Sequence, residues 1–152
     1  MPANTNPIFV LTPNRGVNGG GRITAANTTR DLSNTSGAVI IFSAGTNGSR
    51  VDSIDWVHAS TGQTGTTGSA PLSVACVGRV FQCSDISYSN PRIIREVALS
   101  AIQASTTVVG QTQTITFSTP LVLPPGYSLV ATMSVAQNSG GYYDVTVYGG
   151  DY

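Results

Sequence analysis

Two runs of alternating apolar and polar residues near the C-terminus constrain the fold of this chain more than any other feature. The first run, residues 127–136, places Tyr, Leu, Ala, Met and Val side chains on one face and Ser and Thr on the other. A period of two is typical of a half-buried β-strand. The second run, residues 142–148, alternates in the same way and follows a Gly-containing segment that can reverse the chain. We therefore predict a long antiparallel hairpin at the centre of an all-β domain.

Shorter runs of the same kind precede this hairpin. Trp56 shares a face with Ile54 and, as the largest apolar side chain, is expected in the core. Residues 93–101 contain good helix formers, but their period of two, with Ile93, Val97 and Leu99 on one face, favours a strand. The predicted strands before the hairpin cover residues 22–26, 38–42, 50–58, 72–82, 93–101 and 111–118. In the last of these, Ile115 and Phe117 are expected to face the core and a row of Thr to face outward. About eight strands without a helix predict an antiparallel β-sandwich or jelly roll.

The chain of 152 residues is expected to form one domain over residues 21–152, preceded by an N-terminal arm over residues 1–20. The arm holds one apolar island, residues 8–11, between two prolines. Three interpretations of this segment stay open. It forms an edge strand, it becomes ordered only on a neighbouring molecule, or it is a partly disordered end of the chain. The candidate partner-binding residues of the arm are Pro7, Ile8, Phe9, Leu11 and Arg15.

Charge is scarce in this sequence. Charged residues make up 9%, the formal net charge is zero, and every basic residue except the single His is Arg. A neutral polar surface suits a subunit that lies against other subunits, although an ordinary β-domain can also have one. Without a basic stripe, nucleic-acid binding is not expected. No apolar run reaches the length of a membrane span, and the N-terminus does not resemble an export signal, so we expect synthesis in a cytoplasm.

The two cysteines are expected to be free thiols. Cys76 lies in the predicted strand 72–82 and Cys83 directly follows it, seven residues from Cys76, so in an extended chain their sulfur atoms would lie on the order of 20 Å apart on opposite faces. Small buried apolar side chains are the expected role of both.

The sequence offers little for catalysis or metal binding. Its one histidine, His58, has Asp55 and Asp85 as conceivable triad partners, but no Gly-x-Ser-x-Gly turn accompanies them. The one glutamate, Glu96, is expected to point away from Arg95, and the spacing of Asp52 and Asp55 does not match a calcium loop. We therefore expect no enzyme, no catalytic residue, no metal and no cofactor. The polar segment 61–69 is expected to be an exposed loop and a candidate contact surface.

Three stretches of the chain resemble small all-β proteins encoded near the capsid genes of tailed bacteriophages. They are residues 48–54, residues 92–99 and residues 121–132, within a similarity that covers roughly residues 38–148. Members of that group are capsid decoration, or cement, proteins that sit on the outside of the shell, often as trimers. The resemblance implies a virion structural protein on the capsid surface, with the major capsid protein and further copies of itself as partners.

A second function stays open at this point, namely a receptor- or carbohydrate-binding β-domain of a phage tail fibre. Four tyrosines near the C-terminus are suited to stacking on sugar rings, or else to packing within the sheet or at a subunit interface. They are Tyr142, Tyr143, Tyr148 and Tyr152.

Overall fold

The computed structural model describes residues 12–14, 20–60, 73–102, 110–138 and 140–152, which contain nine strands and no helix. No helix among these residues is long and apolar enough to cross a membrane. The all-β prediction is confirmed. The strands are β1 (Thr12–Asn14), β2 (Gly20–Ile23), β3 (Val39–Ser43), β4 (Ser49–Ser60), β5 (Cys76–Cys83), β6 (Arg92–Leu99), β7 (Thr112–Leu123), β8 (Ser128–Met133) and β9 (Gly141–Asp151).

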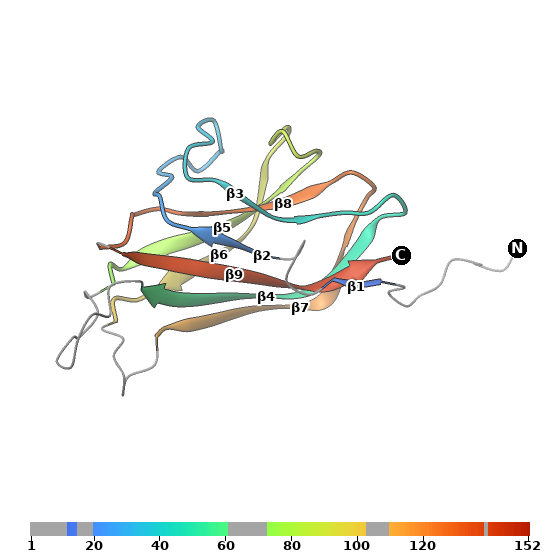
Figure 1. Ribbon diagram of the computed structural model, residues 1–152. Coiled ribbons are helices and arrows are strands. Elements are labelled where there is room, and N and C mark those ends of the chain that lie inside the picture. Colours follow the sequence, from blue (N-terminus) through green and yellow to red (C-terminus); the bar gives the residue numbers. More distant parts are fainter. Residues whose placement is uncertain (1–11, 15–19, 61–72, 103–109, 139) are drawn as a thin grey trace, which may run out of the picture.

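The strands form two antiparallel sheets that pack face to face (Figure 1). One has the order β1-β9-β4-β7, with β2 also paired with β9, and the other has the order β3-β8-β5-β6. The pairs are nested in sequence, because β5 pairs with β6, β4 with β7, β3 with β8 and β2 with β9. A long hairpin rolled into two sheets produces this nesting, which is the topology of a jelly roll.

The core lies between the two sheets around Trp56, whose side chain is fully buried. Ile54 is buried on the same face of β4, and Ile115 and Phe117 of β7 also point into the core, as predicted. Gly78 of β5 lies against the indole: a Cβ atom there would sit 3.0 Å from the Trp56 ring. The absence of a side chain at position 78 thus lets β5 pass close to the largest core residue.

The predicted C-terminal hairpin is wrong. β8 and β9 are both interior strands, but they belong to different sheets: β8 lies between β3 and β5, and β9 lies between β2 and β4. The chain therefore leaves one sheet at the end of β8 and enters the other at the start of β9. Alternation in two neighbouring runs established that both are strands, but it carried no information about their partners.

Two predictions about strand faces are also corrected. All six residues of β8 are buried, so this strand is not half-buried as its alternation indicated. In β6, the pairing with β5 shifts by one residue between Val80 and Phe81, because Ile94 is inserted as a bulge. Ile94 consequently packs against the core, whereas Ile93 is 37% exposed.

The two cysteines are free and buried, as predicted. Cys76 and Cys83 stand at opposite ends of β5, are buried, and are not joined by a disulfide. Cys76 faces the main core, and Cys83 faces a second apolar cluster on the other side of the sheet. Burial raises the pKa of the Cys83 thiol to about 11, with a smaller contribution from Asp85, which keeps this thiol protonated and unreactive.

Part of the predicted N-terminal arm is an edge strand. Thr12–Asn14 forms β1 and pairs with the last residues of β9, next to the C-terminus (Figure 1). The candidate partner-binding residues of the arm lie outside the described residues, and so does the segment 61–69. Gly20, which belonged to the predicted arm, begins β2 instead.

Candidate functional site

The two outer faces of the jelly roll differ in what covers them. Residues 24–38, here called the cover loop, connect β2 to β3 and cross the outside of the β3-β8-β5-β6 sheet. Leu32 of the cover loop is 3% exposed and packs on Phe81, Cys83 and Val130, which form the second apolar cluster. The cover loop, together with the loop after β5, whose Asp85 carbonyl accepts from the Ser128 hydroxyl, explains why β8 is buried on both faces.

Asn27 fixes the shape of the cover loop from inside. Its side-chain Nδ2 donates to the carbonyls of Asn34, at 2.6 Å, and Ser36, at 2.8 Å. Its Oδ1 accepts from both the backbone N–H and the hydroxyl of Thr29. Since Asn27 is 2% exposed and its side-chain amide is fully engaged in hydrogen bonds, this asparagine has a structural role.

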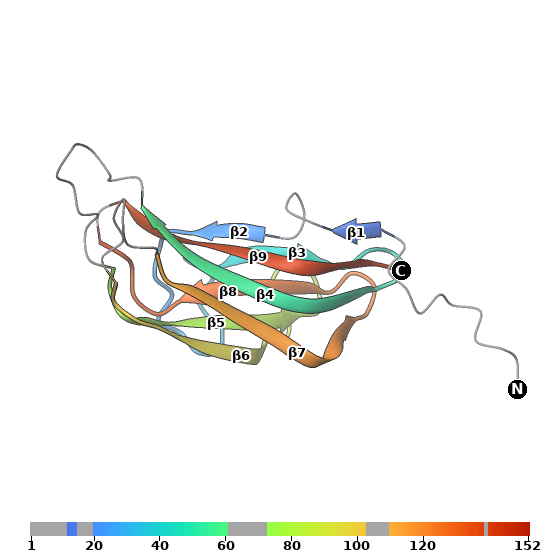
Figure 2. The same cartoon turned by 90° about the horizontal axis from the view of Figure 1, so that it is seen from below.

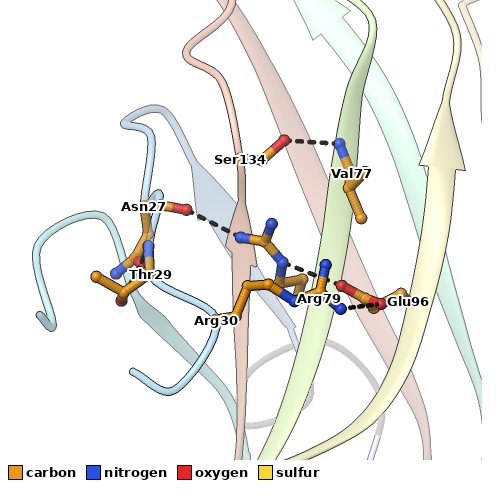
Figure 3. Close-up of polar contacts among 7 residues, drawn as sticks. All are labelled: Asn27, Thr29, Arg30, Val77, Arg79, Glu96 and Ser134. Carbon is orange, nitrogen blue, oxygen red and sulfur yellow. Dashed lines mark hydrogen bonds and ion pairs between the residues drawn. The ribbon is translucent and has the colours of Figure 1, made fainter. Parts of the chain in front are cut away.

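An ion-pair network fastens the cover loop to the sheet (Figure 3). Arg79 of β5, with a side chain only 7% exposed, donates to Glu96 Oε1 at 3.2 Å and to the Asn27 carbonyl at 3.2 Å. Glu96 of β6 also accepts from Arg30 of the loop through its other oxygen, at 2.9 Å. Glu96 therefore bridges two arginines and serves a structural role, which the sequence did not indicate.

The outer face of the other sheet, here called the open face, is not covered by the cover loop. It consists of the side chains of β4, β7 and β9 that alternate with core residues, and of Arg22 on β2. Figure 2 shows these three long strands side by side. The members of the open face are Arg22, Ser53, Asp55, Val57, Thr112, Thr114, Thr116, Tyr142, Asp144, Thr146 and Tyr148.

Hydroxyl groups dominate the open face, and most of its charges are paired. Thr112, Thr114 and Thr116 are exposed and form the row of threonines that the sequence predicted for this segment. Arg22 pairs with Asp144 at 3.0 Å, and its guanidinium lies 3.9 Å from the centre of the Tyr142 ring.

Asp55 is the exception on this face. It lies between Thr114 on β7 and Thr146 on β9, and no described cation pairs with it. Its Oδ1 is buried and has no hydrogen-bond partner in the described part of the chain. The open face thus presents one unpaired carboxylate near its centre, surrounded by threonines.

The groups considered for a catalytic triad are not brought together. His58 is 4% exposed and points inward, whereas Asp55 is on the opposite face of β4. Asp85 accepts hydrogen bonds from the backbone N–H groups of Ser89 and Ser87 within its own loop, and these bonds, chiefly those from Ser89, lower the pKa of Asp85. Among the described residues, no group of three or more His, Cys, Asp or Glu side chains is placed to hold a metal ion.

His58 is instead an unusual core residue. Neither ring nitrogen has a hydrogen-bond partner among the described residues, and the ring packs edge-on against Tyr143 with a centroid distance of 5.2 Å. Burial lowers the pKa of His58, because a charged imidazolium would lose its hydration there.

The four C-terminal tyrosines separate into different roles. Tyr143 is fully buried, and its ring contacts Trp56 and His58, so it packs within the core and is not on a rim. Tyr142 and Tyr148 lie on the open face, and Tyr152 is half-buried at the C-terminus. The outward positions of β4 and β9 were readable from their alternation, but the sequence did not show that these strands are neighbours.

Comparison with known proteins finds no family model that matches the chain and no curated protein with significant similarity to it.

Proposed function

We propose that this protein is a virion structural protein that decorates and stabilises the outer surface of an assembled bacteriophage capsid. Its partner is then the major capsid protein, and its place is the capsid surface of particles assembled in the host cytoplasm. The open face is the observation that carries the proposal. It is a broad sheet face that the cover loop leaves open, with hydroxyl and tyrosine side chains and a single unpaired charge among its described members.

The chemistry of the open face suits contact with another protein. Interface cores are depleted of charged residues, because an unpaired charge loses its hydration on association. They are also enriched in tyrosine. The contrast with the opposite face supports this use, since there the chain covers its own sheet with Leu32 and Asn27. Jelly rolls occur in viral capsid proteins and in lectins, which agrees with the proposal by analogy of fold only.

Stabilisation follows from mass action, and the proposed role is not enzymatic. A protein that binds only the assembled lattice lowers the free energy of that state. A homo-oligomer would add the contacts of several copies.

Binding to capsids that lack the protein tests the proposal. Purified protein mixed with undecorated heads should co-sediment with them at micromolar concentration and raise their melting temperature. Val57→Lys, which adds a charge to the open face, should weaken binding at least about tenfold by the cost of burying that charge. Ser87→Lys adds the same charge to the exposed loop between β5 and β6 and should bind normally. Absence of co-sedimentation, or equal loss with both variants, would argue against this function.

Carbohydrate binding by a tail-fibre domain is the second candidate. The observation that favours it is the presence of Tyr142 and Tyr148 on the same face as Asp55 and the threonines, since aromatic rings stack on sugars and a carboxylate accepts from sugar hydroxyls. A glycan array distinguishes the two functions. Binding that is lost in Tyr148→Ala, without binding to heads, would favour the second candidate.

A further inference from the structure

Sheet edges differ in how well they are protected from pairing with another molecule. An exposed edge strand presents unpaired backbone N–H and C=O groups, and proteins commonly protect it with charges, prolines, bulges or short length. The two sheets described here have four edges. They are formed by β1 with β2, by β3, by β6 and by β7.

Three of these edges carry such protection. β1 has three residues and contains Pro13, and β2 has four residues, with Arg22 among them. β3 has a bulge between Ile40 and Phe42, and β2 approaches it so closely that a Cβ on Gly21 would meet Val39. β6 contains three charged residues and a bulge at Ile94, whose carbonyl accepts a hydrogen bond from Arg95 at 2.9 Å.

β7 is the exception. Its twelve residues, Thr112–Leu123, contain no charged side chain, and its one proline, Pro120, follows the first half of the strand. Thr112–Thr116 pairs with β4 in unbroken register, and the irregular part of that pairing comes after Thr116. The strand β7 is the lowest ribbon in Figure 1. One of its edges pairs with β4, and no described strand pairs with the other edge.

We propose that the first half of β7 pairs with the same segment of a second copy of this chain, in antiparallel orientation about a two-fold axis. The segment is complementary to itself. In an antiparallel pair, side chains directly opposite each other share a face, so the exposed threonines would meet threonines of the second copy. Threonine pairs across strands are favourable, and the two paired segments contain no charged residue of their own. The two open faces would then form one continuous surface.

Two registers place threonines opposite each other at the centre of the pair: Thr114 faces either Thr114 or Thr116 of the second copy. Charged variants at both positions test the pairing in either register. The native protein should have twice the mass of the 15.7 kDa chain, or an even multiple, by sedimentation equilibrium at micromolar concentration. T114K/T116K and T114E/T116E each place like charges opposite each other in the pair. Each variant alone should therefore dissociate with a dissociation constant raised at least about tenfold. An equimolar mixture of the two should form a heterodimer.

The controls separate this result from misfolding and from the proposed function. Circular dichroism should show that both variants are folded, and T146K, on the same face but on β9, should keep the native mass. A monomeric or trimeric native protein, variants that keep the native mass, or folded variants that do not recombine would each overturn the pairing. The measurement uses no capsid, so its outcome is independent of binding to heads.

Discussion

His58 is the residue whose ionisation should control stability in mildly acidic solution. It is the only histidine, and burial without a hydrogen-bond partner lowers its pKa in the folded state from the ordinary value of 6.5. The unfolded chain therefore binds the proton more readily than the folded chain. The stability due to neutral His58 is fully present above pH 6.5 and is lost as the pH falls through the window below 6.5.

The corresponding experiment compares the native protein with His58→Phe. The free energy of unfolding of the native protein should fall from pH 7 to pH 5, whereas the variant should change little over this range. Asp31 and Asp85 do not confuse the result, because hydrogen bonds lower their pKa values from 3.8 and their contributions are lost only at more acidic pH. Urea unfolding at several pH values measures both slopes, and equal slopes would contradict the assignment.

Glu96 should contribute far more to stability than its partner Arg30. Replacing Glu96 by Ala leaves the buried Arg79 guanidinium without a counter-charge, which typically costs about 3–5 kcal/mol. Arg30→Ala removes an arginine whose side chain is 66% exposed, and such surface pairs contribute about 0–1 kcal/mol. Chemical denaturation of the two variants should give this order. Similar losses would mean that Arg79 does not depend on Glu96.

At the scale of elements, strand identity could be predicted from the sequence and strand pairing could not. Alternation is a local property, and it correctly placed Trp56, Ile115 and Phe117 in the core. Pairing is non-local: β8 pairs with β3, far back in the sequence, although β9 is the next strand. The polar cover loop gave no sign that Leu32 and Asn27 would be buried, because only the folded sheet provides the surface on which they pack.

The cover loop should be able to detach from its sheet while the two sheets stay folded. Asn27→Ala removes the hydrogen bonds to Asn34 and Ser36 that hold the loop, and Cys83 lies in the cluster beneath it. A thiol reagent should therefore label Cys83 faster in the variant, while Cys76, between the two sheets, keeps its native rate. Mass spectrometry after maleimide treatment measures the two sites separately. A parallel increase at both cysteines would indicate general unfolding instead.

For the whole molecule, the nested pairing makes the last strand a partner of the first ones. β9 pairs with β1, β2 and β4, and it contributes Tyr143, Val145 and Val147 to the core. The open face, too, exists only when β9 has joined β4. Neither property is visible in any one segment, which is why the candidate binding surface required the folded chain.

Supplying β9 as a separate peptide tests this dependence. The fragment 1–140 should remain unfolded, because β2 and β4 lack their common neighbour and Trp56 loses part of its cover. Adding the peptide 141–152 should restore the fold, measured by β-type circular dichroism and by the blue shift of Trp56 emission on burial. A peptide with Val145→Asp should fail, since an isolated carboxylate would enter the core. A fragment that folds without the peptide would show that the first eight strands form the jelly roll by themselves.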